Sequence, residues 1–331
     1  MAAKPRKRPG EFALIARYFR PLASDPGAFD LLDDAALYRQ QPVDDLVFTT
    51  DMIAAGVHFF ADDPPESIAR KALRVNLSDL AAKGALPYGY LLTLALQADW
   101  TERWVSAFAR GLKGDQETYG VALLGGDTIR ASGGVSVSIT AIGRVPKGRM
   151  VLRSGARPGD VVFVSGTIGD AALGLGLRLG RLDGHTVRGA KALHDRYLHP
   201  QPRVALARVL RRHATSAMDV SDGLIGDLGH ICEASGVGAE IESALVPLSA
   251  PARRLVMADR DMLATVLTGG DDYEILATVG ERAAVRFARD AEEAGVPVTR
   301  IGRIVNGEGP PRVRDATGAT IRLTGGGHTH F

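Results

Sequence analysis

The residues of this chain whose types and spacing could do chemistry are gathered in five short clusters, each containing aspartate. The clusters are Asp33-Asp34, Thr49-Thr50-Asp51, Asn76-Leu77-Ser78-Asp79, Gly125-Gly126-Asp127-Thr128 and Asp219-Val220-Ser221-Asp222-Gly223. One such cluster alone is more typical of a helix cap or a turn than of a ligand site. Together they indicate Mg²⁺, which proteins bind through a few carboxylates in combination with substrate phosphates.

Among these residues, Asp79 gives the strongest support for a metal site. It interrupts the apolar run of a helix expected over residues 67–83. An unpaired carboxylate in such surroundings is strongly destabilising, so a positive partner is expected beside it. We therefore predict that Asp79 is a metal ligand.

Other segments combine glycine with charge. Gly125-Gly126-Asp127-Thr128 is expected to follow a strand over 121–124, where backbone N–H groups could approach a phosphate; a tight turn is the alternative. Arg149 and Arg153 could clamp a phosphate, although surface arginines are commoner. The sequence Gly-Gly-Asp-Asp-Tyr-Glu at 269–274 is interpreted as a loop before a strand. His58 taken alone is more typical of a packed or surface histidine.

Several function classes are excluded or disfavoured by the sequence. No Walker A phosphate loop, Ser-His-Asp set or H-E-x-x-H motif is legible. Lys plus Arg total 40 against 38 for Asp plus Glu, which predicts no nucleic-acid partner. No run of 18 uncharged apolar residues occurs, so no membrane association is expected. The single cysteine, Cys232, cannot form an internal disulfide, which fits a cytoplasmic protein, and it is predicted to be a buried thiol.

Apolar periodicity predicts a chain of mixed α and β elements in two domains. Helices are expected over 11–19, 67–83 and 102–119 and strands over 46–50, 90–96, 121–124 and 135–144, which predicts an α+β first domain with a partly antiparallel sheet. The second half is expected to hold strands over 161–165, 274–279 and 298–304, helices over 170–179 and 223–235, and an exposed loop over 181–191. Pro/Gly breaks near 146–159 place the junction, giving a basic tail over 1–10 and domains over 11–148 and 149–331.

The motifs, taken in order, resemble those of bacterial thiamine-monophosphate kinase. The segments that carry the resemblance are Gly-Glu-Phe-Ala-Leu-Ile at 10–15, Thr50-Asp51 with His58, Val-Asn-Leu-Ser-Asp-Leu-Ala-Ala at 75–82, and the clusters at 125–128, 219–224 and 269–274. Looser forms of two of them occur in the aminoimidazole-ribotide synthetase and selenophosphate synthetase superfamily. The resemblance implies a homodimer, an α+β first domain that binds ATP and magnesium and whose strands pair across the dimer, and an α/β second domain that completes the active site.

The resemblance also implies an activity and its residues. The activity is ATP- and magnesium-dependent phosphorylation of thiamine monophosphate to thiamine diphosphate by direct in-line transfer. The implied magnesium ligands are Asp33, Thr49, Thr50, Asp51, Asp79, Asp127, Asp219 and Asp222. The implied ATP contacts are Gly126, Asp127, Arg149 and Ser221, and the implied substrate contacts are His58, Asp271 and His328.

Three departures from the family pattern bear on the site. Asp30-Leu31-Leu32 replaces a G-x-G, Asp271 replaces a glutamate of longer reach, and His328 replaces an aromatic residue. Two alternatives stay open at this point. One is another ATP-using enzyme of the superfamily, although the reactive Cys and Lys of selenophosphate synthetase and the C-terminal Cys of the hydrogenase-maturation relative are missing. The other is a non-catalytic sensor of nucleotide and magnesium.

Overall fold

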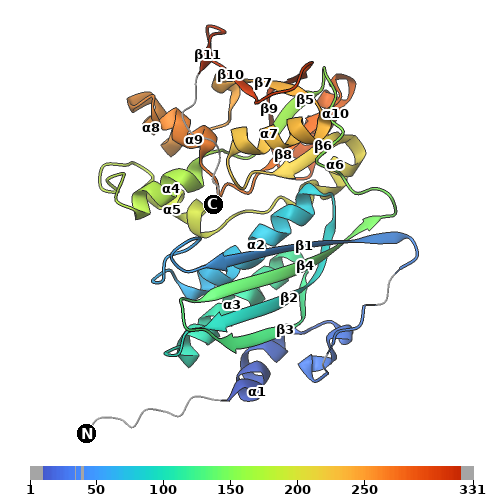
Figure 1. Cartoon of the computed structure of the whole chain (residues 1–331), viewed down its shortest axis with the longest axis vertical. Coiled ribbons are helices and arrows are strands. Elements are labelled where there is room, and N and C mark those ends of the chain that lie inside the picture. Colours follow the sequence, from blue (N-terminus) through green and yellow to red (C-terminus); the bar gives the residue numbers. More distant parts are fainter. Residues whose placement is uncertain (1–9, 34, 39–40, 322–331) are drawn as a thin grey trace. The chain divides into compact units, whose positions relative to one another are not determined.

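The structure is a computed structural model that describes residues 10–33, 35–38 and 41–321 of the chain. It divides into two compact units. The first unit is Met1–Asn76 with Pro87–Arg144, and the second is Leu77–Leu86 with Val145–Phe331. Each unit combines a sheet with helices, and helix α2 (Pro65–Ala82) begins in the first unit and ends in the second, which confirms the predicted two-domain α and β architecture (Figure 1).

The first unit is built on a four-stranded sheet with the order β1-β4-β2-β3. Its strands are β1 (Asp44–Ala54), β2 (Leu86–Leu96), β3 (Ala122–Arg130) and β4 (Ser136–Pro146). Strands β2 and β3 are parallel, with a register shift between Tyr90 and Leu91. Helices α2 (Pro65–Ala82) and α3 (Glu102–Tyr119) lie on one face of this sheet (Figure 1).

Helix α3 has clear start and stop signals in the sequence. The Thr101 side chain caps its first turn by accepting a hydrogen bond from the Trp104 N–H at 3.1 Å. Gly120 ends it in the left-handed region, with φ of 65°. In the middle of the helix, Gly111 allows close packing on α2, because an added Cβ would lie 2.4 Å from the Glu66 carbonyl oxygen.

The segment before β1 is less regular than predicted. The helix expected over 11–19 is α1 (Glu11–Leu14) continued by a π-helix over Ile15–Phe19. A 3-10 segment over Pro26–Leu31 follows, and Phe29, Asp30 and Leu31 have positive φ values of 48°, 55° and 55°. The chain thus takes a glycine-like conformation next to Asp33 without glycine, which is a strained arrangement.

The second unit contains a seven-stranded sheet with the order β11-β10-β7-β9-β5-β8-β6. The strands are β5 (Val161–Ser165), β6 (Ala214–Asp219), β7 (Gly238–Glu242), β8 (Ile275–Val279), β9 (Val298–Val305), β10 (Arg312–Arg314) and β11 (Thr320–Ile321). Neighbouring strands are antiparallel except for the parallel pair β7 and β10.

Helices cover both faces of this second sheet. They are α4 (Asp170–Arg178), α5 (Ala190–Leu198), α6 (Ala207–His213), α7 (Leu224–Ser235), α8 (Ala250–Ala258), α9 (Met262–Thr268) and α10 (Glu281–Glu293). Strand β5 contributes to two separate cores, since Val162 and Val164 pack with α7 residues while Val161 and Phe163 pack with α6 and α10 residues. Alternation along one strand therefore divides its apolar side chains between the two faces.

Most predicted elements occur close to their expected bounds, but three expectations are wrong. The strands expected over 46–50 and 121–124 continue through β1 to Ala54 and through β3 to Arg130. The loop expected over 181–191 ends earlier, because α5 begins at Ala190. Because of these extensions, predicted site residues lie within the strands rather than after their ends.

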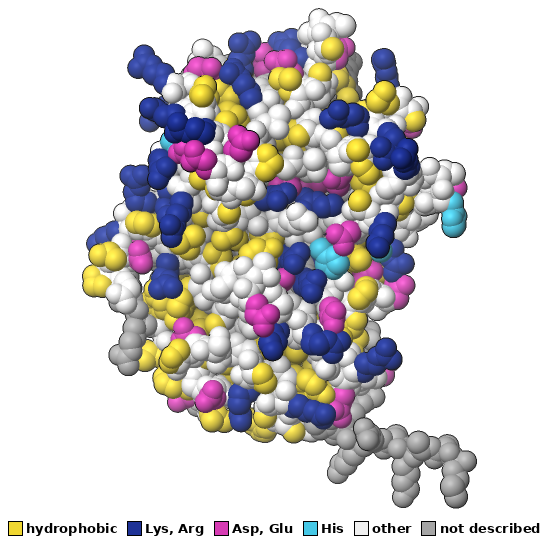
Figure 2. Space-filling model, turned by 180° about the vertical axis from the view of Figure 1, so that it is seen from behind, with side chains coloured by type: hydrophobic (Ala, Val, Ile, Leu, Met, Phe, Trp, Pro, Cys, Tyr) yellow, Lys and Arg dark blue, Asp and Glu magenta, His cyan; other side chains and the backbone are white. Residues whose placement is uncertain are grey.

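The surface carries charges of both signs (Figure 2), and the one thiol is buried. On the face seen in Figure 2, Lys and Arg side chains are interspersed with Asp and Glu. Among the helices that the structure describes, none combines the length and the apolar character needed to cross a membrane. Cys232 is buried in α7, as predicted, and burial raises the pKa of its thiol to about 11.

Candidate active site

Strand β1 carries three of the predicted magnesium ligands. We expected Thr49, Thr50 and Asp51 to close a strand, but they lie inside β1, so that expectation is wrong. Side chains alternate along a strand, which places Thr49 and Asp51 on the side of buried Val47 and Ile53 and Thr50 on the opposite, exposed side. The three side chains therefore do not converge on one point within this strand.

Asp51 and Thr50 are tied to different neighbours. The Asp51 backbone N–H donates to the Asn76 side-chain oxygen of α2 at 3.0 Å. The Thr50 hydroxyl donates to the Ile139 carbonyl of β4 at 3.2 Å and accepts from the Thr140 hydroxyl at 3.1 Å. The N-L-S-D motif thus contributes its asparagine to holding β1, one helical turn before Asp79.

The glycine pair of β3 also differs from its expected place. We expected Gly125-Gly126 after a strand, but both residues pair with β2, Gly125 with Leu91 and Gly126 with Leu92. Glycine is needed at 126 because φ is 154° and an added Cβ would lie 1.8 Å from the Leu92 carbonyl oxygen. The two glycines therefore mark a close backbone approach beside a register shift, and Asp127 projects from within the sheet.

The predicted ligands on β1 and β3 lie at opposite edges of the same sheet. Asp127 pairs with Thr93 of β2 and is exposed. Strands β4 and β2 separate β1 from β3, which corresponds to about 14 Å at the usual spacing between strands. One copy of the chain therefore does not bring Asp51 and Asp127 together.

Two further predicted residues of the first unit lie outside the sheet. The His58 ring accepts a hydrogen bond through Nδ1 from the Ala54 N–H at 3.2 Å, and its carbonyl accepts from the Lys71 ammonium at 3.0 Å. This fixes the ring beside the end of β1. Asp33 is exposed in the segment after the strained 3-10 turn.

The last residues of α2, 77–82, belong to the second unit, which gathers Asp79 with a lysine and a second aspartate. Asp79 is half-buried among fully buried residues at the end of α2, and Lys83 one turn later donates from its ammonium to the Ala217 carbonyl of β6 at 2.8 Å. Burial lowers the pKa of Lys83, as does the charge of Arg153, whereas the carboxylates of Asp219 and Asp79 act in the opposite direction. Carboxylates of α2 and β6 thus share one electrostatic neighbourhood.

The 219–223 and 269–274 motifs are joined through their backbones. Asp219 ends β6, and the chain turns through Ser221 and Asp222 into α7, as predicted. The Asp271 N–H donates to the Ser221 carbonyl and the Tyr273 N–H donates to the Val220 carbonyl, both at 2.8 Å. Two motifs some 50 residues apart in the chain therefore form one surface in the second unit.

Buried acids hold the loop that carries Asp271. Asp271 and Tyr273 have positive φ values of 70° and 50°. Asp272 is fully buried and accepts the Gly169 N–H with both carboxylate oxygens, and burial raises its pKa well above the usual value. Glu274 is also fully buried and forms ion pairs with Arg196 and Arg203. These anchors keep a strained loop in one conformation.

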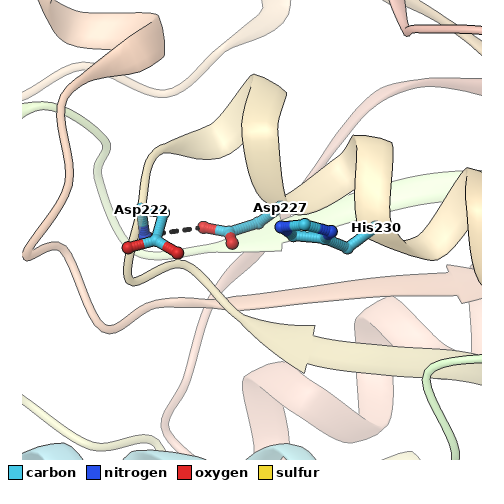
Figure 3. A group of neighbouring side chains, drawn as sticks. All are labelled: Asp222, Asp227 and His230. Atoms are coloured by element: carbon cyan, nitrogen blue, oxygen red, sulfur yellow. Dashed lines mark hydrogen bonds between the residues drawn. The ribbon is translucent and has the colours of Figure 1, made fainter. Parts of the chain in front are cut away.

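Asp222 belongs to a second group of side chains that sequence reasoning missed (Figure 3). Ligand atoms of Asp222, Asp227 and His230 lie within 4.8 Å of one another, a spacing that could hold a metal ion. Burial raises the pKa of Asp227 to about 7. The signal in the sequence was the pair Asp227 and His230, three residues apart on one face of α7.

The remaining predicted residues are less informative. Arg149 is exposed, and its guanidinium donates to the Arg211 carbonyl at 3.0 Å. Arg153 is also exposed, and its charge acts on Lys83. Asp34 and His328 lie outside the described residues.

Comparison with known proteins also divides the chain into two parts. The chain matches the AIR synthase related protein N-terminal domain over residues 32–145 and the C-terminal domain over residues 157–313. Thiamine-monophosphate kinase of Caulobacter vibrioides is 45% identical over 315 residues, which are 93% of this chain and 88% of that protein. The crystal structure of thiamine-monophosphate kinase from Stenotrophomonas maltophilia is 40% identical, with a TM-score of 0.83 over 94% of this chain and 98% of that one. A structure of AaThiL complexed with AMPPCP and TMP is 32% identical, with a TM-score of 0.76 over 99% of this chain and all of that one (100%).

Proposed function

Because the chain belongs to the AIR synthase related protein family and, within it, to the thiamine-monophosphate kinases, we propose that it transfers the γ-phosphate of ATP to thiamine monophosphate and forms thiamine diphosphate. The similarity extends over nearly the whole chain, and the AaThiL structure with AMPPCP and TMP pairs a nucleotide analogue with the acceptor. The observation that carries the proposal is the joined surface of Ser221, Asp222 and Asp271 in the second unit.

The acidic residues fit magnesium rather than a softer metal. Their donors are carboxylate and hydroxyl oxygens, which are the ligands that Mg²⁺ prefers. The proposed ligands are those of the family motif: Asp33, Thr49, Thr50, Asp51, Asp79, Asp127, Asp219 and Asp222. Bound magnesium would offset the repulsion between two polyanions and the charge on the transferring phosphoryl group.

The main task of the protein in this reaction is to position the two substrates rather than to supply an acid or a base. The acceptor is a phosphate monoester with a second pKa of about 6, so it is mostly a dianion and already nucleophilic near neutral pH. We assign ATP contacts to Gly126, Asp127, Arg149 and Ser221, and contacts with thiamine monophosphate to His58 and Asp271. The hydrogen bonds that hold His58 and the Asp271 loop support this role, because each group is fixed before a ligand arrives.

Direct transfer predicts a stereochemical result. A single in-line displacement inverts the configuration at a chiral γ-phosphorus, whereas a phosphoenzyme intermediate would retain it. Turnover of ATP to ADP only when thiamine monophosphate is present separates the kinase from another superfamily enzyme and from a sensor. Asp79→Ala is expected to abolish that turnover with the circular dichroism spectrum unchanged, and near-normal turnover would contradict the assignment of Asp79.

We also propose that the chain works as a homodimer. One face of the first sheet, the open face, exposes the apolar side chains Phe48, Met52, Leu91 and Ile129. Apolar surface of this kind is typical of an interface, and a second copy would also offer a route to unite ligands that lie at opposite edges of one sheet. We further propose a cytoplasmic location, which the single cysteine supports because it cannot form an internal disulfide.

The dimer has a direct test. Met52→Glu places a charge on the open face and is expected to give a monomer by light scattering, with activity lost. Val285→Glu is the control, since Val285 is an apolar residue that is even more exposed, on α10 of the second unit, and its change should leave the dimer intact. A wild-type chain that is monomeric at all concentrations at which it is active would refute the proposal.

A further inference from the structure

Asp227 is a buried acid to which the proposed reaction gives no part. It lies in the first turn of α7 and is only 1% exposed. One carboxylate oxygen, Oδ2, accepts the backbone N–H groups of Asp222 at 3.0 Å and Gly223 at 3.1 Å. The other, Oδ1, is buried and has no hydrogen-bond partner among the residues that the structure describes.

The turn before α7 lacks a side-chain acceptor at its N-cap position. Position 223, the N-cap of α7, is glycine and so has no side chain to accept the N–H groups of the first turn. Glycine is required there because φ is 116° and an added Cβ would lie 2.6 Å from the Thr268 carbonyl oxygen. Gly223 therefore contributes no side chain to this turn, and the backbone N–H groups of Asp222 and Gly223 are accepted by Asp227 from within α7.

Figure 3 shows the Asp227 carboxylate between Asp222 and His230, with its hydrogen bond directed to the Asp222 backbone. One observation favours a structural task over metal ligation for this carboxylate. Its Oδ2 already accepts two backbone N–H groups, those of Asp222 and Gly223. The His230 side chain is about half exposed, and its Nδ1 lies 4.0 Å from the Glu233 carboxylate.

We propose that Asp227 is a positioning residue, which fixes the backbone of Ser221, Asp222 and Gly223 so that the Ser221 and Asp222 side chains are presented to the magnesium–nucleotide complex. The inference rests on the proposed function, because Ser221 and Asp222 are its assigned ATP and magnesium contacts. The Ser221 carbonyl also accepts the Asp271 N–H. By fixing the Ser221 backbone, Asp227 therefore also fixes one end of the loop that carries Asp271.

The test compares variants by the affinity of the magnesium–AMPPCP complex, measured by calorimetry, and by turnover. Asp227→Ala is expected to weaken this affinity about tenfold or more, with a matching rise in the magnesium concentration that half-saturates turnover. Asp227→Asn can still place one oxygen against both N–H groups, so it is expected to recover most of the loss. If the alanine variant does not fold, Asp227→Ser, whose hydroxyl cannot reach both donors, takes its place.

Two further arms distinguish positioning from a general structural role. In the Asp222→Asn background, the added Asp227→Ala change is expected to have little further effect on magnesium dependence, because Asp227 acts through Asp222. Glu233→Ala, exposed on the same helix, is the control and should match the wild type. Full additivity of the two changes would overturn the proposal, and so would an equal loss of magnesium affinity in His230→Ala, which would identify the group as a metal site.

The proposed function can fail separately. A wild-type chain that binds magnesium–AMPPCP but shows no turnover with thiamine monophosphate would refute the kinase assignment and leave the Asp227 comparison intact. An Asp227→Ala variant with wild-type affinity and a stable fold would refute the positioning role while the kinase assignment stands.

Discussion

Removing the Glu274 side chain is expected to be among the most damaging single changes in the second unit. Glu274 is fully buried and accepts hydrogen bonds from Arg196 at 2.9 Å, from the Arg203 Nε at 2.6 Å and from the Ser165 hydroxyl at 2.6 Å. Glu274→Ala leaves two largely buried guanidinium groups without their carboxylate. Breaking a buried pair from one side costs about 3–5 kcal/mol, most of it from the uncompensated charge left behind.

Urea unfolding can measure this loss and assign it to the correct unit. Both tryptophans of the chain, Trp100 and Trp104, lie in the first unit, so tryptophan fluorescence reports that unit alone. Circular dichroism reports both units. For a denaturant slope of about 2 kcal/mol per molar, the expected loss lowers the urea midpoint of the second unit by about 2 M.

Glu281→Ala is the matched control for this experiment. Glu281 also pairs with an arginine, Arg300, but both side chains are more than half exposed. An exposed pair contributes about 0–1 kcal/mol, so this variant should shift the midpoint little. A Glu274→Ala variant that loses less than about 1 kcal/mol, or no more than the control, would refute the reasoning from burial.

Three further predictions follow from local features. Hydrogen bonds from His213 and Arg289 lower the pKa of Asp290 to about 2. This acid therefore stabilises the fold above its unfolded pKa and ceases to do so as pH falls from about 4 to about 2, so the melting temperatures of wild type and Asp290→Asn should differ at pH 6 and converge near pH 2. Leu31→Gly removes a left-handed leucine and is expected to raise the free energy of unfolding by about 0.5–1 kcal/mol in urea titrations, and a loss of stability would contradict the strain at that position. Gly111→Ala forces a methyl group against the α2 backbone and should cost about 1–3 kcal/mol by tryptophan fluorescence, whereas Gly133→Ala, with open space around it, should be neutral.

Much of the second unit's site could be predicted from the sequence, because it depends on local signals. An apolar strand followed by Asp219, a Gly and a second apolar run is a strand-to-helix turn, and the structure has β6 and α7 there. Asp79 was singled out by a similar local signal, one polar residue in an apolar helix, and its role as a metal ligand stays a prediction. In both cases the candidate residue lies where a strand ends or where one polar residue interrupts a regular apolar pattern.

The site residues of the first unit were harder to place from the sequence, because their arrangement depends on contacts between residues distant in the chain. Gly125-Gly126 is a normal turn signal, and only the approach of β2 turns it into the middle of a strand. The order β1-β4-β2-β3, which separates Asp51 from Asp127, leaves no local trace in the sequence. Asp227 escaped notice because its importance comes from two backbone N–H groups, which a sequence does not display.

The solitary thiol of Cys232 offers a practical advantage. Because it is buried and its pKa is about 11, thiol-directed probes should ignore it in the folded protein. Cysteines introduced at Ser132 in the first unit and Met257 in the second, both exposed, can then carry a pair of spin labels or fluorophores on an otherwise native chain. The distance between such labels, followed during nucleotide addition, would show whether the separation of these two positions changes when nucleotide binds.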